Sequence, residues 1–442
     1  MQTMQFHEKL TILEDSLNDI DVVRIYGKVV QVVGLLIESS GPSVAVGDVC
    51  KVFPRQGHLP YIAEVVGFRE NRVLTMPLGE MRGIAPGSDI VALGEPFSVW
   101  VSPEMLGRVL NGLGEPMDGR GAIANGERMS VYQDPPHPLT RQRIIKPIST
   151  GIRALDGLLT FGKGQRVGIF AGSGVGKSTL LGMVAQNTNA DVNVISLVGE
   201  RGREVRDFIE KELGEEGLKR SILVVATSDQ PALVRVKAAL VATTIAEYFR
   251  EQGADVMLMM DSLTRVATAL REIGLTVGEP PTTRGYTPSV FAFFPKLLER
   301  AGTSTQGSIT GLYTVLVEGD DMNEPIADAA RGILDGHIVL SRKLASAGHY
   351  PAIDVLESIS RVMNDVTTSQ HLSASSKLLD TLATYKEAED LINIGAYVKG
   401  NNPKIDYSIS KIEQIQQFLR QGIREKAELQ SSIARVMDIV RD

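Results

Sequence analysis

Cysteine and histidine are scarce in this chain. Its one cysteine, Cys50, cannot form an internal disulfide, and the six histidines are scattered without the paired spacing of a structural zinc site. A chain of 442 residues therefore depends on hydrophobic cores alone, and at this length two or three domains are expected. These scarcities argue against a disulfide-rich secreted scaffold, and a reducing cytoplasm fits.

Aromatic residues and excess positive charge are also lacking. Aromatic residues make up 5% of the chain, and its formal net charge is -7. Proteins that bind nucleic acid usually rely on basic surfaces and on aromatic side chains that stack on bases. We therefore expect no nucleic-acid partner, although a local basic patch stays open as an alternative.

Long hydrophobic runs are missing as well. The start, Met1–Asp21, has acidic residues and no continuous apolar stretch, and later runs such as Val256–Met260 are far too short to cross a bilayer. The sequence predicts a cytoplasmic protein with neither a signal peptide nor a membrane span.

The first segment, residues 1–21, is predicted to be an amphipathic helix. Its apolar residues follow each other at steps of three and four, which places them on one helical face: Phe6, Leu10, Leu13, Leu17 and Ile20. That face either packs on the protein's own next domain or docks onto a partner helix, and spacing does not separate the two.

Residues 22–93 are predicted to form a small β-barrel. Short β-rich runs alternate there with turn residues: Val29–Val33, Leu35–Glu38, Val44–Val46, Val49–Phe53, Tyr61–Phe68 and Val73–Met76. So many short strands in so little sequence favour a closed barrel, which leaves no exposed edge.

Residues 94–364 are predicted to form an α/β domain, and residues 365–442 a helical domain. After the proline-rich connector at residues 134–138, apolar strands alternate with helical stretches. The expected strands are Arg166–Phe170, Val192–Val198, Ile222–Ala226, Val256–Met260 and Leu312–Val317. The expected helices are Thr179–Gln186, Glu204–Leu213 and Ala232–Gln252. This alternation is typical of a mostly parallel sheet with helices on both faces.

A glycine-rich loop between a strand and a helix carries the strongest functional signal. Its residues are Ala171, Gly172, Ser173, Gly174, Val175, Gly176, Lys177 and Ser178, and Thr179 continues into the helix. Backbone N–H groups of such a loop and the helix N-terminus bind phosphate oxygens, Lys177 adds a full positive charge, and the Ser178 hydroxyl can ligand Mg²⁺. A glycine-rich turn without a ligand is the bland alternative.

Two carboxylates are candidates for the chemistry beside this loop. Asp261 ends an apolar strand, where burial without a cation is costly, so we interpret it as a Mg²⁺ ligand; a cap of the following helix is the alternative. Glu200 follows the strand Val192–Val198 at the edge where open α/β folds gather ligands, and could activate water. A solvated salt-bridge cluster with its neighbouring arginines is the alternative there.

The chain resembles the flagellar and type III secretion export ATPases, relatives of the catalytic subunits of rotary ATP synthases. The resemblance runs from about Val22 to the C-terminus and includes the signature segment of that superfamily, Pro351–Ser360. Segments at Asp229–Ala232, Gly278–Pro281 and Gly319–Pro325 resemble the export enzymes, and those at Gly41–Val44 and Asp390–Tyr397 resemble the flagellar branch. The resemblance implies a RecA-like P-loop core between the barrel and the helical domain.

The resemblance also implies roles for single residues. It assigns Lys177 to the phosphates, Ser178 and Asp261 to the Mg²⁺ shell, Glu204 to the metal's water shell, and Glu200 to water activation. Arg201 and Arg265 would lie near the γ-phosphate, and Arg361 would enter a neighbouring subunit's site, although pairing with Glu357 is its alternative.

Tyr350 matches the tyrosine that stacks on adenine in the family. Where rotary catalytic subunits carry Pro-Phe against the base, this chain has Gly422-Ile423, so looser base selectivity is expected.

By the same resemblance, the expected cofactor is Mg²⁺ with ATP, and the expected assembly is a homohexamer at the inner face of the cell membrane. The expected partners are a stator-type regulator on the N-terminal helix, a stalk-type protein, export substrates with their chaperones, and an export gate. An injectisome ATPase, a hexameric RNA translocase and a non-catalytic ring subunit are the rival interpretations.

Overall fold

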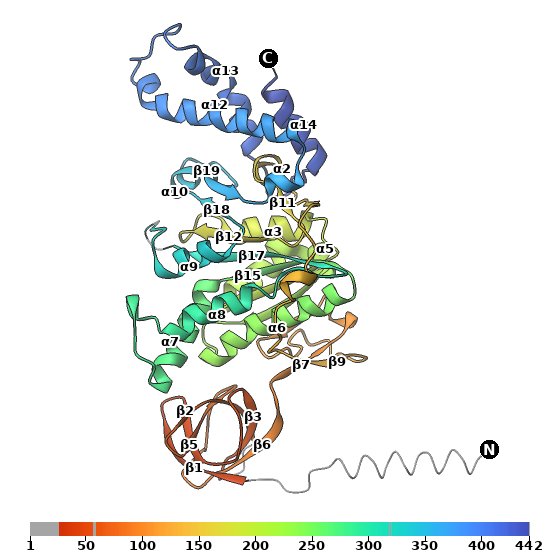
Figure 1. The fold of residues 1–442 in the computed structure, drawn as a ribbon, viewed down its shortest axis with the longest axis vertical. Coiled ribbons are helices and arrows are strands. Elements are labelled where there is room, and N and C mark those ends of the chain that lie inside the picture. Colours follow the sequence, from red (N-terminus) through yellow and green to blue (C-terminus); the bar gives the residue numbers. More distant parts are fainter. Residues whose placement is uncertain (1–25, 56–58, 318, 320, 442) are drawn as a thin grey trace, which may run out of the picture. The chain divides into compact units, whose positions relative to one another are not determined.

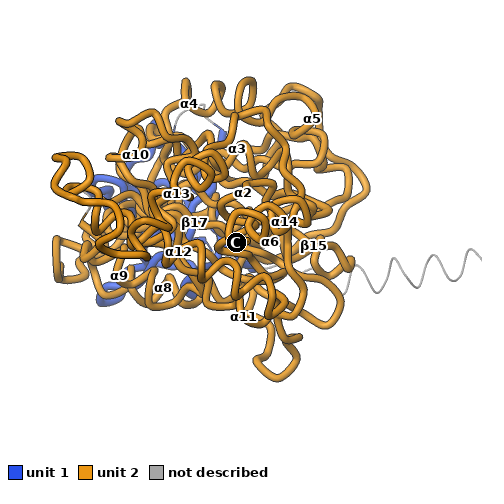
Figure 2. Tube along the Cα trace, turned by 90° about the horizontal axis from the view of Figure 1, so that it is seen from above, with its two compact units in different colours: residues 1–97 blue, residues 98–442 orange. Residues whose placement is uncertain are grey.

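The computed structural model describes residues 26–55, 59–317, 319 and 321–441, so the helix predicted over residues 1–21 lies outside the described residues. The chain divides into two compact units between Phe97 and Ser98 (Figure 1, Figure 2). Within the described ranges, no helix has both the length and the apolar composition that crossing a membrane requires.

The described part of the first unit is a closed antiparallel β-barrel with the strand order β1-β2-β5-β4-β3-β6 (Figure 1). The strands are β1 (Tyr26–Val33), β2 (Leu36–Ser40), β3 (Asp48–Phe53), β4 (Tyr61–Arg69), β5 (Arg72–Pro77) and β6 (Asp89–Pro96). Its core is made of small and β-branched side chains: Val29, Ile37, Cys50, Val52, Ala63, Val65, Val73 and Ile90.

One predicted barrel strand is wrong. Residues 44–46 enter a turn, in which the Asp48 carboxylate accepts the Ala45 N–H at 2.7 Å and the Asp48 N–H donates to the Ala45 carbonyl at 3.2 Å. The local bonds of Asp48 thus compete with a strand ladder. The sixth strand is β6 instead, which continues to Pro96 and so passes the predicted domain boundary after Leu93.

The second unit is built on a nine-stranded sheet within its described residues, with the order β19-β18-β12-β17-β15-β13-β14-β8 and with β16 beside β17. All neighbours along this order are parallel except β18 and β19, and β16 is antiparallel to β17. The strands are β8 (Val109–Asn111), β12 (Arg166–Ala171), β13 (Val192–Val198), β14 (Ser221–Ala226), β15 (Asp255–Asp261), β16 (Gly302–Thr303), β17 (Ser308–Leu316), β18 (Gly336–Leu340) and β19 (Ile353–Ser360). Two small sheets pair β7 (Ser98–Val101) with β9 (Glu127–Ser130), and β10 (Pro147–Ile148) with β11 (Phe161–Gly162). The predicted mostly parallel sheet is confirmed.

Helices cover both faces of this sheet, and β13 shows how. Asn193 faces α3 (Lys177–Asn187), where its amide donates to the Ala185 carbonyl, whereas the Ser196 hydroxyl donates to Ala238 of α6 (Ala232–Glu251) on the other face. The further helices are α2 (Arg153–Leu158), α4 (Gly202–Asp207), α5 (Gly214–Lys219), α7 (Leu263–Val277), α8 (Pro288–Leu298), α9 (Pro325–Ile333) and α10 (Arg342–Ser346). Short 3-10 helices are η1 (Pro103–Met105), η2 (Pro138–Thr140) and η4 (Thr283–Gly285), and η3 (Phe208–Leu213) is a π-helix.

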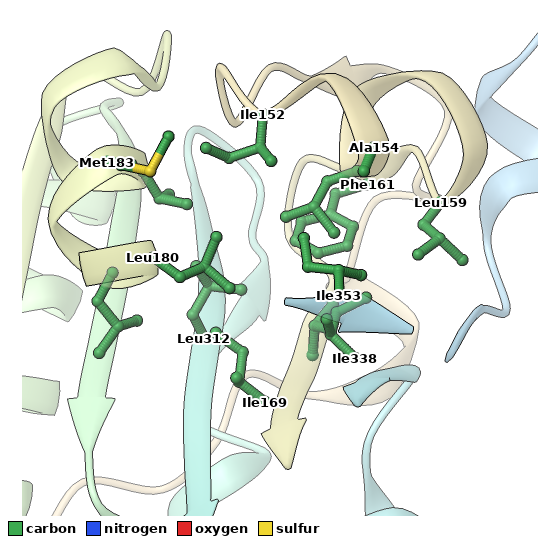
Figure 3. Packing of buried hydrophobic residues seen from close by; sticks show 14 of the residues in the cluster. Ile152, Ala154, Leu159, Phe161, Ile169, Leu180, Met183, Leu312, Ile338 and Ile353 are labelled. Atoms are coloured by element: carbon green, nitrogen blue, oxygen red, sulfur yellow. The ribbon is translucent and has the colours of Figure 1, made fainter. Parts of the chain in front are cut away.

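The core under α3 joins distant segments of the chain (Figure 3). Leu180 and Met183 of α3 face side chains from the sheet, and Ala154 and Phe161 close the cluster near α2. The sheet contributes Ile169 of β12, Leu312 of β17, Ile338 of β18 and Ile353 of β19. This packing fixes the N-terminus of α3, where the glycine-rich loop ends.

In the described residues after β19 the secondary structure is helical, as predicted for the C-terminal region: α11 (Met363–Val366), α12 (Ser369–Asn393), α13 (Pro403–Leu419) and α14 (Leu429–Ile439). α12 and α14 lie beside α2 (Figure 1). The contact is tight at Gly157, where an added Cβ atom would lie 2.8 Å from the Phe418 ring and 2.9 Å from Val436. His371 and Ser375 of α12 both hydrogen-bond to the Gly157 carbonyl.

Candidate nucleotide-binding site

The glycine-rich loop connects the carboxyl end of β12 with α3, as the sequence predicts. Gly174 and Gly176 have φ angles of 79° and 94°, a conformation that residues with a Cβ atom rarely adopt. Gly176 is also the N-cap of α3, so the loop's amide groups and the positive end of the helix share one location.

Lys177, the first residue of α3, lies among acidic side chains at the carboxyl ends of two strands. Its Nζ atom is 2.5 Å from Oδ1 of Asp261, at the end of β15, and 3.5 Å from Oε1 of Glu200, just after β13. Thr314 of β17, the strand between β12 and β15, donates to the same Asp261 oxygen at 2.8 Å. The structure thus brings together the three residues that the sequence places beside the phosphates.

The Glu200 side chain is mostly buried and holds its proton unusually well. Burial raises its pKa to about 7, the negative charge of Asp261 and a hydrogen bond with Glu204 add to this, and Lys177 and Arg265 oppose it. Arg201 instead points to solvent with an 82% exposed side chain and pairs with Glu204 at 3.5 Å. Glu200 therefore faces the loop lysine, and the alternative of a solvated cluster with Arg201 does not describe it.

A cavity of about 960 Å³ opens at this edge of the sheet. Residues 171–174 and 176–179 of the glycine-rich segment line it, together with Glu200, Arg201, Glu204 and Arg265. Val175 is buried instead, and its side chain belongs to the core under α3. The sequence reasoning assigned no site role to several lining residues: Thr264, Thr268, Arg271, Arg284, Tyr286, Glu324 and Arg342. Only Glu324 lies in a segment used for the resemblance.

The oxygen donors at this site fit a magnesium ion that comes with a nucleotide. Ser178 lines the cavity, and the Asp261 carboxylate is buried beside the Lys177 ammonium. Among the described residues, no three His, Cys, Asp or Glu side chains form a cage for a metal. Mg²⁺ in nucleotide sites is commonly held by one or two carboxylates together with phosphate oxygens, so this donor set suits it.

Tyr350 lies next to the loop. Its ring is 3.7 Å from the position of a Cβ atom built on Gly176, and its side chain is exposed. The Gln421 N–H donates to the Tyr350 carbonyl at 2.9 Å, which brings the segment with Gly422 and Ile423 alongside. Ile423 is 53% exposed, so an apolar side chain is available near the tyrosine.

Arg361 lies at the other end of the strands, next to the amino end of β18, whereas the phosphate loop follows the carboxyl end of β12. β12 reaches the loop where Ala171 pairs with Leu340 of β18, whereas β19 leads to Arg361 where Ser360 pairs with Gly336. Four strand residues, about 13 Å, separate the two points. Among the described residues, Arg361 forms no ion pair with Glu357; its guanidinium contacts the Arg331 carbonyl at 3.4 Å.

The parallel sheet, the phosphate loop and the carboxylates at its edge define an ATPase of the P-loop class. Two family models described as ATP synthase alpha/beta family match the chain: the nucleotide-binding domain at residues 151–360 and the beta-barrel domain at residues 29–94. The model described as T3SS EscN ATPase C-terminal domain matches residues 367–438.

Relatives cover almost the whole chain. The flagellum-specific ATP synthase of Bacillus subtilis is 58% identical over 96% of this chain and 98% of its own. The type 3 secretion system ATPase of Xanthomonas euvesicatoria is 50% identical over 98% of both. The structure of the assembled ATPase EscN from enteropathogenic E. coli has a TM-score of 0.89 and 47% identity, and covers 94% of this chain and all of that one. A second EscN structure, in complex with its central stalk EscO, has a TM-score of 0.87 and 46% identity with the same coverage. The chain belongs to the family of flagellum-specific ATP synthases and type III secretion ATPases, which confirms the resemblance, the fold class and the ATPase activity predicted from the sequence.

Proposed function

We propose that this chain hydrolyses Mg-ATP in a homohexameric ring and that the hydrolysis energises flagellar-type protein export. The position of Arg361 carries the proposal, because this arginine is too far along the sheet to reach its own phosphate loop. A site that lacks its arginine in one subunit is complete only when a neighbour supplies it. The assembled state of EscN supports such a ring.

The loop and its neighbours would divide the work of phosphate binding and cleavage. The amides of Gly172–Gly176 and the start of α3, with Thr179, hold the triphosphate, and Lys177 neutralises its outer charge. Ser178 and Asp261 would hold Mg²⁺, with Glu204 in its water shell; the metal neutralises charge that develops on the phosphates.

Water activation falls to Glu200, whose raised pKa suits a group that accepts a proton near neutral pH. Arg265 packs its stem against Gly199 and would reach the γ-phosphate together with Arg201. Arg361 of the neighbouring subunit would stabilise charge on the transferred phosphoryl group. Tyr350 would stack on the base, with Ile423 as a second apolar wall.

The wider role follows the family. We propose that the ring unfolds export substrates and releases them from chaperones at an export gate, as a cytoplasmic protein peripheral to the inner face of the cell membrane. The complex of EscN with EscO supports a stalk-type partner. The segments at residues 41–44 and 390–397 favour the flagellar branch over an injectisome.

The test is ATPase activity as a function of protein concentration, with and without RNA. Wild-type specific activity should rise with concentration as rings form, whereas Arg361→Ala should bind ATP normally and stay at the low rate, about 10³-fold below. Full activity of a monomer would contradict the ring, and stimulation by RNA would favour a translocase. Nucleotide binding without turnover at any concentration would favour a non-catalytic subunit.

A further inference from the structure

Arg361 is held by its backbone rather than by its side chain. Its N–H donates to the Asp335 carbonyl at 3.0 Å, which joins the end of β19 to the start of β18. The guanidinium is exposed, and its hydrogen bond to the Arg331 carbonyl is long, at 3.4 Å. The reach of this arginine is therefore set by where its backbone is fixed.

One buried side-chain amide, that of Gln165, donates to the same carbonyl as the Arg361 N–H. Gln165 is fully buried, and its Nε2 atom donates to the Asp335 carbonyl and to the Ser360 hydroxyl, both at 3.1 Å. Its Oε1 atom accepts the Gly162 N–H at 3.0 Å, which fixes the orientation of the amide. Gln165 thus contacts both the residue before Arg361 and the carbonyl that holds it.

The surrounding bonds make this support rigid. Asp335 grips Arg166 with both carboxylate oxygens, at 3.0 and 3.1 Å, and also accepts the Arg166 N–H at 3.0 Å. The Ser360 hydroxyl donates to the Thr160 carbonyl at 2.9 Å. Arg166 opens β12, so the support belongs to the strand that leads to the chain's own phosphate loop.

We propose that Gln165 is a positioning residue, whose buried amide fixes both Ser360, the residue before Arg361, and the Asp335 carbonyl that accepts the Arg361 N–H, and so aims this arginine at the neighbouring subunit's nucleotide. The inference rests on the proposed function, because it requires Arg361 to act on a neighbour. A misplacement of about 1 Å in a catalytic group can cost about 10²-fold in rate. Gln165→Met keeps the volume and removes both donated bonds. It should lower the ring-activated kcat by about 10- to 100-fold and leave the KM for ATP nearly unchanged.

Mixed rings separate positioning from damage to the fold. Full-length variants are mixed as dilute subunits, concentrated, and assayed for ATPase activity. In the reference pair, Lys177→Ala supplies a working Arg361 and Arg361→Ala supplies a working phosphate loop, so activity should recover. Gln165→Met should recover activity with Lys177→Ala, because its phosphate loop is intact. With Arg361→Ala the mixture should not rise above the reduced rate of Gln165→Met alone, because neither partner offers a well-placed arginine.

Asn193→Met is the matched control. Asn193 is also a fully buried amide and lies on β13, far from β19 in the sheet order. It donates to the Ala185 carbonyl and to the Ser221 hydroxyl. Asn193→Met leaves the contacts around Arg361 intact, so a mixture of Asn193→Met with Arg361→Ala should recover activity. If Gln165→Met does not fold, Ser360→Ala removes one of the same bonds and should show the same complementation pattern with a smaller loss.

Two results would overturn the inference in distinguishable ways. If the reference pair stays inactive, the trans arginine of the proposed function is wrong, and the role of Gln165 falls with it. If the reference pair recovers and Gln165→Met recovers equally well with Arg361→Ala, the trans arginine stands and the positioning role alone is refuted.

Discussion

The ammonium group of Lys177 lies 2.5 Å from the carboxylate of Asp261, although the loop that leads to Lys177 follows β12 and Asp261 ends β15, and these two strands are not neighbours in the sheet. Between β12 and β15 runs β17, whose Thr314 hydroxyl donates to the same carboxylate. The group that binds phosphate and the group that suits the metal are thus oriented by buried partners, which limits the reorganisation that nucleotide binding requires.

Removing the Thr314 hydroxyl should weaken the use of magnesium. Thr314→Val keeps the shape but removes a hydrogen bond to a charged acceptor, worth about 1.5 kcal/mol. The Mg²⁺ concentration for half-maximal ATPase activity, at fixed ATP, should rise about tenfold. Thr310→Val is the control, because that buried hydroxyl on the same strand serves Gly164. An equal Mg²⁺ shift in both variants would show a general effect on β17.

Glu200 should give the activity an acid limb. Its carboxylate can accept a proton only when ionised, so kcat/KM should fall about tenfold per pH unit below an apparent pKa near 7. Glu200→Gln should bind Mg-ATP almost normally, lose most turnover, and show a residual rate without this limb. Measured rates between pH 5.5 and 8.5 decide the matter; a wild-type profile flat down to pH 5.5 would contradict it.

The aromatic ring of Tyr350 should contribute to ATP affinity by stacking on the base, and its hydroxyl should not contribute. Tyr350→Ala should weaken ATP binding about tenfold, since an aromatic contact of this kind is worth about 1 kcal/mol beyond its buried area. Tyr350→Phe should bind like the wild type. Titration with fluorescent ATP and GTP analogues measures both, and looser base selectivity predicts similar losses for the two nucleotides. No loss with alanine would place the base elsewhere.

Arg153 should hold the C-terminal segment against α2. Its buried guanidinium donates to the Phe418 carbonyl at 3.1 Å and also contacts Arg420 and Glu425, and its N–H donates to the Gln421 side chain. Arg153→Leu should cost about 1–3 kcal/mol and speed amide exchange in residues 418–425. Unchanged amide exchange in residues 418–425 would show that Arg153 does not hold this segment.

Glu425→Gln is the milder version of this change, because Glu425 is about half exposed. The hydrogen bond from Arg153 lowers the pKa of Glu425 below its ordinary value. The charge of Glu425 therefore stabilises the folded chain at neutral pH, and this contribution should disappear as the pH falls through the acidic range. The thermal stability of wild type and Glu425→Gln should converge at low pH.

Deleting residues 1–19 should abolish binding of a stator-type partner and leave the fold intact. The expectation comes from the apolar face between Phe6 and Ile20. Co-purification with the partner and circular dichroism measure the two effects. Unaltered partner binding would end the hypothesis.

Much of the fold is readable from the sequence because central parallel strands are continuous apolar runs. β13 and β15 stand out in this way, and both were predicted almost to their ends. β18 and β19 were not, because β18 has only five residues and β19 is buried on one face, with polar residues between. The order of the strands follows from tertiary packing, which no local pattern encodes.

The site residues also divide into those that a local sequence pattern marks and those that only tertiary contacts reveal. The phosphate loop, Asp261 and Glu200 are marked by motif and by position after strands, so sequence reasoning found them. Thr314 and Gln165 lie within or beside ordinary strand sequence, and only their contacts reveal what they hold. The sequence itself shows only a polar residue directly before an apolar strand, and the burial of Gln165 became visible in the structure.

β12 connects the two parts of the chain that act on nucleotide. Its carboxyl end enters the phosphate loop, and its amino end adjoins Gln165 and Arg166, whose partners support Arg361. The six residues of this strand span about 20 Å. In a closed ring, this one strand would connect the nucleotide of one subunit with the arginine which that subunit offers to the next, so the occupancy of one site would bear on the rate of its neighbour.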